Sequence, residues 1–243
     1  MSGHSKWSTI KRKKGALDQK RGKSFSVLSK EITIASRLGG GSIDENPRLR
    51  LAVKKAKSLN MPNANIDKAI KKGTGEIEGL SIEEVTYEGY GPFGVAFLIE
   101  GATDNKNRTV ADIRHGFNKF GGSLGQNGSV AWNFNRFGVI QISCSNYEEE
   151  KVFDLSVQCD AKDFLIDDDV YRLIFNPNDL YSNVEKIEKN GIEIENSFLA
   201  FLPNEYVSLH VEEFSKVNDL IDFLDELEDV QNVFTNLTLK EDS

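Results

Sequence analysis

The sequence predicts an α+β fold in which an N-terminal three-helix domain precedes two α/β domains, one inserted into the other. Up to about residue 78, short stretches with apolar residues at helical spacing alternate with glycine and proline. From residue 81 the pattern changes to β-branched runs separated by helical stretches. One complete series of strand, helix, strand, strand, helix and strand lies between two half-series, which indicates an insertion.

The N-terminal domain is expected to contain three short helices. The first lies in SFSVLSKEITIASRLGGG, where apolar residues recur on one face and three glycines follow. The second has Asn46 as its cap and Pro47 as its first residue, and the third follows Met61 and ends at Gly73. Their narrow apolar stripes can bury only a thin core, which suits a small binding module.

The remaining chain is expected to form two ferredoxin-like α/β domains. VTYEGYGPFGVAFLIE is typical of a hairpin, KNRTVADIRHGFNKF of a capped helix, and GGSLGQNGSVAWNF of a glycine-rich loop that leads into a strand. Near the C-terminus, YVSLHVE and VFTNLTL are expected strands on either side of a helix. The complete series between these halves is expected to be an inserted module. The expected domains are residues 1–78, residues 79–135 with 204–243, and the insertion 136–203.

Charge is distributed unevenly along the chain. Residues 1–72 hold 18 lysines and arginines against 5 acidic residues, whereas residues 73–243 hold 12 against 33, within a formal net charge of −8. Such asymmetry predicts a polyanionic partner for the basic end. Nucleic acid is the leading candidate. A membrane surface would need an apolar anchor beside the basic residues, and residues 1–24 have none.

Several other classes of function find little support. GYGPFG matches the dinucleotide fingerprint in spacing, but a strand follows it where a helix is required, so we expect no nucleotide cofactor. The two cysteines and three histidines lack metal-ligand spacing. There is no signal peptide, so we expect a cytoplasmic protein. A non-enzymatic protein without a small-molecule substrate is expected, although an unrecognised carboxylate pair remains a remote alternative.

Cationic and aromatic residues of the N-terminal segment are the candidates for contact with nucleic acid. They are Lys6, Trp7, Lys11, Arg12, Lys13, Lys14, Lys20, Arg21, Lys23, Arg50, Lys54 and Lys57. Lysine and arginine attract phosphates whatever the base sequence, and Trp7 can stack on an unpaired base. We expect the first 22 residues to form an arm that becomes ordered on its partner.

A second, auxiliary contact is expected on the helix KNRTVADIRHGFNKF and the loop that follows it. Arg108, His115 and Lys119 lie opposite its apolar face, either as ordinary solvated surface or as a polyanion contact. Exposed N–H groups of residues 121–128 could also hold a phosphate. A simple turn is the alternative explanation of this loop, and the residues alone favour it.

Several motifs together resemble the YebC/PmpR family, to which the mitochondrial translational activator of cytochrome oxidase is similar. They are GHSKW, IKRKKGALDQKRGK, NPRLR, MPNANIDKAIKKGTG, YEGYGP, TDNKNRT, GGSLGQNGSVAW and DVQNVFTN. The resemblance runs along the whole chain and implies a non-enzymatic cytoplasmic protein of three domains. The chain departs from the family at Phe93, where the family usually reads GPGG, and also at 25–28 and 158–163.

The resemblance implies two kinds of partner. Some family members are described as DNA-binding transcriptional regulators and others as ribosome-associated factors that assist translation through proline runs. Duplex DNA and ribosomal RNA therefore stay open as partners. The helix that follows Pro47 has lysine and arginine but no asparagine or glutamine before Asn60, which suits phosphates better than base edges.

Overall fold

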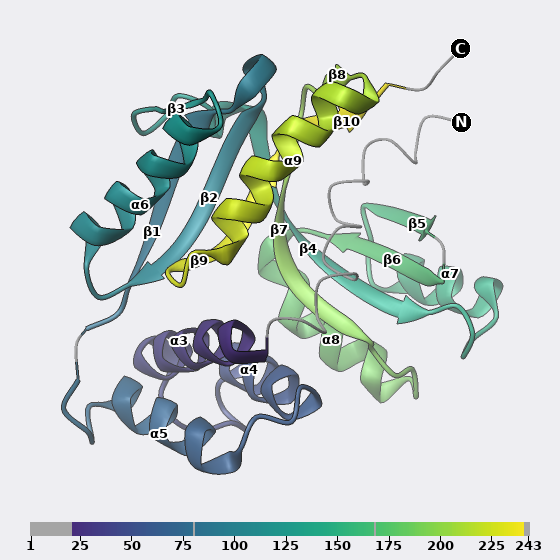
Figure 1. Ribbon diagram of the computed structural model, residues 1–243. Coiled ribbons are helices and arrows are strands. Elements are labelled where there is room, and N and C mark those ends of the chain that lie inside the picture. The colour runs from purple at the N-terminus through teal and green to yellow at the C-terminus, as the bar shows by residue number, and fades with distance from the viewer. Residues whose placement is uncertain (1–20, 80, 168, 241–243) are drawn as a thin grey trace. The chain divides into compact units, whose positions relative to one another are not determined.

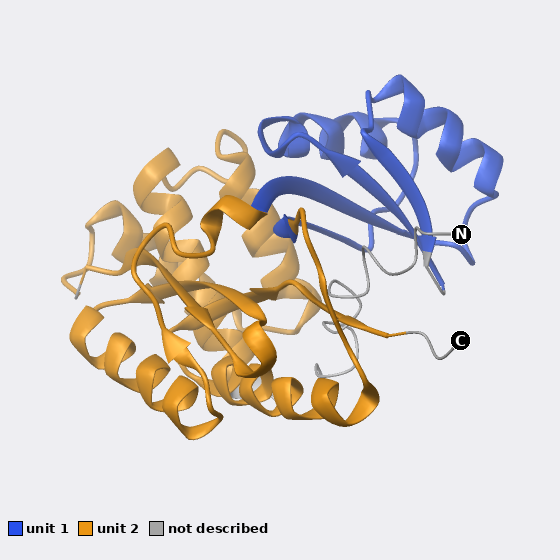
Figure 2. Cartoon of the chain, turned by 90° about the horizontal axis from the view of Figure 1, so that it is seen from above, with its two compact units in different colours: residues 1–6, 134–202 blue, residues 7–133, 203–243 orange. Residues whose placement is uncertain are grey.

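The computed structural model describes residues 21–79, 81–167 and 169–240 (Figure 1). Two compact units divide this part of the chain (Figure 2). Phe134–Leu202 form one unit, and residues 21–133 with 203–240 form the other. The chain therefore leaves the larger unit after Asn133 and returns to it at Pro203. Residues 1–20, which hold most of the expected arm, lie outside the described residues.

Three helices form the N-terminal part of the larger unit: α3 (Arg21–Gly39), α4 (Pro47–Ser58) and α5 (Asn63–Thr74). Asn46 caps α4 as expected, because its side-chain oxygen accepts a hydrogen bond from the Leu49 N–H at 3.1 Å. The end of α5 differs from the expectation. Gly75, with φ of +80°, forms the left-handed cap, whereas Gly73 lies inside the helix.

A thin apolar core joins these helices, as the narrow stripes predict. Its buried residues are Leu28, Ile32, Ala35, Leu49, Ala52, Val53, Ala56, Met61, Ile66 and Ala69. Helices α3 and α5 approach closely at Gly73, where a Cβ atom would lie 2.3 Å from the Thr33 carbonyl oxygen. The Thr33 hydroxyl also donates to the Ala69 carbonyl oxygen at 3.1 Å. Small side chains at this crossing therefore allow the two helices to pack.

A four-stranded antiparallel sheet forms the rest of the larger unit. Its strands, in order across the sheet, are β3 (Ser123–Leu124), β1 (Glu83–Tyr90), β2 (Ala96–Thr103) and β9 (Val230–Thr235). The short turn η1 (Pro92–Gly94) joins β1 to β2, which confirms the predicted hairpin. Helices α6 (Lys106–Lys119) and α9 (Val211–Glu226) pack on one face of the sheet and share its core (Figure 1).

Two expected strands do not join this sheet. SVAWNF forms the end of a loop and the turn η2 (Ala131–Asn133), and only its last residue belongs to a strand. YVSLHVE contributes just β8 (Val207–Leu209), which pairs in parallel with β10 (Leu237–Leu239). Asn236 explains why β8 pairs with β10 and not with the sheet, because it interrupts VFTNLTL. Its side chain accepts a hydrogen bond from the Ala96 N–H, and its carbonyl oxygen accepts one from the Val207 N–H.

The inserted unit has the predicted ferredoxin-like order of elements. They are β4 (Phe134–Ser143), α7 (Glu149–Gln158), β5 (Asp163–Asp167), β6 (Val170–Phe175), the turn η3 (Pro177–Asp179), α8 (Leu180–Lys189) and β7 (Asn196–Pro203). The sheet order is β5-β6-β4-β7, so the first and third strands of the unit are central and the others form the edges. This arrangement is the split βαβ fold that the sequence predicts.

A buried carboxylate joins α3 to the sheet of the larger unit. Asp229, immediately before β9, accepts hydrogen bonds from Lys30 of α3 at 2.7 Å and from Arg108 of α6 at 2.8 Å. The hydroxyl groups of Thr103 and Thr109 donate to the same carboxylate at 3.1 and 2.8 Å. Burial alone would raise the pKa of Asp229, but these donors outweigh it and lower the pKa to about 2.

Candidate nucleic-acid interface

Helices α4 and α5 expose lysines on the sides opposite to their buried faces. The exposed lysines are Lys54, Lys55 and Lys57 on α4 and Lys68, Lys71 and Lys72 on α5. Lys57 and the three lysines of α5 form no ion pair within the described part of the chain. Their ammonium groups are therefore free to attract an external polyanion.

Arginines of α3 and α4, in contrast, bond to the protein itself. Arg48 forms a two-pronged pair with Glu31 of α3, at 2.7 and 2.9 Å, and also reaches Glu84 of β1 at 2.7 Å. Arg50 donates to two backbone carbonyls of the loop before α4, and Arg37 bonds to the segment before β1. The planar guanidinium suits such fixed contacts, whereas an ammonium is a hydrated point charge. Arginine therefore has a structural role here, and lysine provides the exposed charge.

The residues predicted from sequence fall into three groups. Lys6, Trp7, Lys11, Arg12, Lys13, Lys14 and Lys20 lie outside the described residues. Arg21 and Lys23 stand in the first turn of α3, where Lys23 is half-buried. Arg50 is half-buried and bonded to the loop before its own helix, whereas Lys54 and Lys57 are exposed. The exposed surface of α4 thus carries two of the three candidates expected there.

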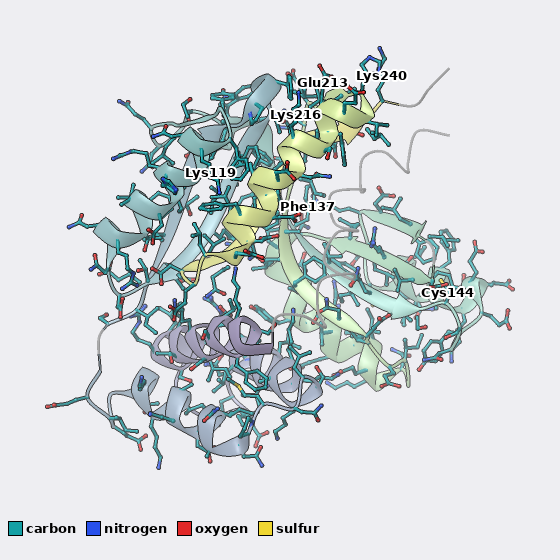
Figure 3. All side chains as sticks on the ribbon, in the orientation of Figure 1. Lys119, Phe137, Cys144, Glu213, Lys216 and Lys240 are labelled. Atoms are coloured by element: carbon teal, nitrogen blue, oxygen red, sulfur yellow. The ribbon has the colours of Figure 1, made fainter. Side chains whose placement is uncertain are left out.

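The auxiliary residues of α6 do not converge on one site. The Arg108 guanidinium bonds to Asp229 at 2.8 Å and to Asp104 at 3.0 Å, and these hydrogen bonds raise its pKa. The Lys119 ammonium, near the other end of the helix, lies 5.1 Å from the centroids of two phenylalanine rings (Figure 3). His115 is exposed beside one of these rings. Arg108 therefore bonds within the fold, whereas His115 and Lys119 are exposed and have no acidic partner among the described residues.

The glycine-rich loop after α6 already holds an anion of its own. Glu88 of β1, which is 5% exposed, accepts hydrogen bonds from the N–H groups of Gly128, Val130 and Ala131 at 2.7–2.8 Å. Burial raises the pKa of Glu88, but the three backbone donors prevail and lower it. The expectation that this loop offers its N–H groups to a phosphate is wrong for these three groups, because the Glu88 carboxylate occupies them.

Other kinds of site are weakly represented in the described residues. A shallow, open depression of about 360 Å³ lies between β1 and α6, and Tyr87 and Lys106 are the titratable groups that line it. The described residues contain no cluster of three or more histidine, cysteine or acidic side chains suited to a metal ion. They also contain no helix with the length and apolar character needed to cross a membrane.

Sequence reasoning missed the lysines of α5. Lys68, Lys71 and Lys72 follow the i, i+3, i+4 spacing that places side chains on one face of a helix. This spacing was readable in NIDKAIKKG and could have identified them. The contacts of Arg48 with Glu31 and of Arg108 with Asp229 had no local signal, because these acidic partners are distant in the sequence. Arg50 bonds to carbonyl groups of a loop of irregular conformation, which the sequence does not indicate either.

Comparison with known families covers nearly the whole chain. Residues 5–76 match the TACO1/YebC protein N-terminal domain, and residues 82–237 match the TACO1/YebC second and third domain. The boundary between these matches falls in the segment between α5 and β1. A crystal structure of a conserved hypothetical protein from Aquifex aeolicus superposes with a TM-score of 0.88 at 43% identity, over 97% of this chain and 98% of that chain.

Curated relatives have nearly the same length and carry a regulatory name. A protein of Prosthecochloris aestuarii is 50% identical over 242 residues, which are 99% of this chain and 97% of the relative. A protein of Desulfatibacillum aliphaticivorans is 49% identical over 243 residues, which are 100% of this chain and 98% of the relative. Both are named probable transcriptional regulatory protein. Because both family matches follow one another along the chain and a relative is 50% identical over 99% of it, this chain belongs to the TACO1/YebC family.

Proposed function

We propose that this protein is a non-enzymatic, nucleic-acid-binding regulator of gene expression. The observation that supports it best is the division of roles among the basic residues of α4 and α5. The arginines of α4 bond within the protein, while Lys57, Lys68, Lys71 and Lys72 form no ion pair with any other described residue. Ammonium groups without a fixed geometry suit the phosphate backbone, which they contact regardless of base sequence. The names of the relatives agree with a regulatory role.

The basic arm is the second part of this proposed interface. Its six lysines and arginines within residues 1–20 add to the exposed lysines of α4 and α5. The acidic remainder of the chain would be repelled by the same polyanion and would orient the basic part toward it. A place in the cytoplasm belongs to the same proposal.

Binding to duplex DNA and to RNA should be tested by titration at several salt concentrations. Each lysine–phosphate contact contributes about −0.9 to the slope of log K against log salt for duplex DNA and about −0.7 for single strands. Lys68→Glu with Lys71→Glu should weaken binding and make the slope shallower by about 1.5–2. Lys162→Glu with Lys189→Glu, at exposed positions of the inserted unit, changes the net charge equally and should have a much smaller effect. Equal losses in both variants would show that net charge acts without an interface.

Ribosomal RNA is the second candidate partner. Helix α4 has no asparagine or glutamine along PRLRLAVKKAKS, so it lacks the side chains that commonly read adenine in the major groove. Cross-linking in cells followed by sequencing of the bound polymer separates the candidates. Recovery of promoter DNA would support a transcriptional regulator, whereas recovery of ribosomal RNA would support a translation factor.

A further inference from the structure

Two exposed aromatic side chains of the larger unit share one hydrogen-bond acceptor. The Tyr90 hydroxyl at the end of β1 and the Trp132 Nε1–H in η2 donate to the Ser129 carbonyl oxygen, at 2.9 and 3.0 Å. Tyr90 is 39% exposed and Trp132 is 64% exposed. Their polar atoms are thus satisfied within the protein, and what remains for a ligand is mainly the surface of the rings. We call Tyr90 and Trp132 the aromatic pair.

The acceptor of the aromatic pair is held in place by the buried Glu88 carboxylate. Its hydrogen bonds from Gly128, Val130 and Ala131 fix the loop on both sides of Ser129. A further bond joins the Gly125 N–H to the Glu88 carbonyl oxygen at 2.7 Å. Four backbone hydrogen bonds to the buried, ionised Glu88 therefore hold the loop, and the Ser129 carbonyl in turn restricts the two rings, which stay largely outside the core. Such preorganisation lowers the entropic cost of binding a ligand.

The surroundings of the aromatic pair are polar. Gln126 and Asn127 are exposed on the same loop, between Gly125 and Gly128. Amide side chains of this kind can hydrogen-bond the edge of a base. Phe93, three residues beyond Tyr90, is also exposed, and the Lys216 ammonium of α9 lies 5.9 Å from its ring centroid. Figure 3 labels Lys216 on α9. Exposed aromatic rings beside a loop with amide side chains fit an unpaired nucleotide better than they fit an apolar protein surface.

We infer that the aromatic pair stacks on unpaired bases of the nucleic acid that the exposed lysines bind. This inference rests on the proposed function and specifies its ligand: a single-stranded segment, of RNA or DNA, rather than a continuous duplex. Glu84 at one end of β1 contacts α4, and Tyr90 lies at the other end of the strand. At about 3.4 Å per residue the two ends are about 20 Å apart, a distance that a strand of a few nucleotides can span.

Tryptophan fluorescence tests the inference directly. The chain has two tryptophans, so Trp7→Phe leaves Trp132 as the sole tryptophan and keeps an aromatic ring at position 7. A short oligouridylate and a short oligothymidylate should quench the Trp132 emission, because stacking places a base against the indole. A blunt duplex of the same length and inorganic polyphosphate should leave the emission nearly unchanged. Polyphosphate quenching equal to that of the oligonucleotides would assign the signal to charge alone and overturn the inference.

Affinity measured with a labelled oligonucleotide supplies a second readout. Trp132→Ala should weaken binding of the oligouridylate about tenfold, within the range found for base–aromatic stacking. Phe153→Ala removes another exposed aromatic ring, 48% exposed on α7 of the inserted unit, and should leave the affinity unchanged. Oligonucleotide binding with unquenched Trp132 and an unaffected Trp132→Ala variant would overturn the stacking site while the proposed function stands. No binding of any nucleic acid at low salt would overturn both.

Discussion

At the scale of single residues, two buried carboxylates perform different tasks. Glu88 holds a loop through backbone donors, whereas Asp229 joins α3, α6 and β9 through side-chain donors. Both are ionised because several hydrogen bonds outweigh the cost of burial. In the sequence, both are acidic residues in an acidic half of the chain, and nothing local separates them from solvated ones.

Asp229→Asn should lower the free energy of unfolding by about 2 kcal/mol at neutral pH. The pKa of Asp229 is lowered from 3.8 to about 2, so its contribution is complete above about pH 4 and is lost as the pH falls through about 2. Urea unfolding of both proteins between pH 2 and pH 6 should show the difference shrinking toward the acid end. Asp222→Asn, on the exposed side of α9, is the control and should change stability little. A difference between wild type and Asp229→Asn that does not depend on pH would contradict the ionic explanation.

Phe93 is strained, and its replacement by glycine should stabilise the protein. Its φ is +61°, in the left-handed region that residues other than glycine and asparagine rarely adopt, and its ring is 45% exposed. Phe93→Gly should raise the free energy of unfolding by roughly 0.5–1 kcal/mol, measured by urea unfolding. Phe93→Ala removes the same ring but keeps the Cβ atom, so it should bring no such gain.

At the scale of elements, helix boundaries follow local chemistry, but close packing follows contacts across helices. Helix α4 starts at Asn46–Pro47 as the sequence predicts, and the helix predicted to be capped, α6, has Asn105 as its cap, because capping bonds form within four residues. Gly73 was expected to end α5, yet it lies within the helix and faces Thr33 of α3. A glycine required by a neighbouring helix looks, in the sequence, like a glycine that ends one.

Gly73→Ala should destabilise the protein by about 1–3 kcal/mol. The added Cβ atom would lie 2.3 Å from the Thr33 carbonyl oxygen and 2.7 Å from the Ser36 Cβ atom, so α3 and α5 would have to move apart. Alanine favours a helix by about 1 kcal/mol relative to glycine, but this gain is smaller than the cost of the overlap. Gly79→Ala is the control, since its nearest neighbour is a lysine side chain at 3.8 Å. A thermal unfolding midpoint of Gly73→Ala equal to that of Gly79→Ala would contradict this packing.

At the scale of the whole molecule, charge is divided between a basic N-terminal part and an acidic remainder. The structure divides the basic residues further: Arg48, Arg50 and Lys30 bond within the protein, whereas the lysines of α4 and α5 are exposed. The total positive charge of the N-terminal part therefore overstates what is available to a partner. The charge that remains available comes from the arm and from the exposed lysines of α4 and α5.

Deletion of residues 1–20 should reduce nucleic-acid affinity strongly and leave the fold intact. The deletion stops before Arg21, because α3 begins there and its Phe25 packs against the apolar core. Loss of six cations should make the salt slope shallower by up to about 5 on duplex DNA. A full-length variant with glutamine at these six positions should behave alike, since charge rather than length is lost. Unchanged affinity in the deletion variant, at an unchanged unfolding midpoint, would refute a role for the arm.

The sequence by itself determined most of the order of helices and strands, the inserted unit, the N-terminal cap of α4 and the location of the charge. These features depend on periodicity and on contacts within a few residues, which a linear pattern records. Tertiary structure alone decided that β8 pairs with β10, that Glu88 accepts hydrogen bonds from backbone N–H groups of the glycine-rich loop, and that Arg108 binds Asp229 rather than a ligand. Their partners lie tens to more than a hundred residues apart in the chain, and only the folded backbone brings them within hydrogen-bonding distance.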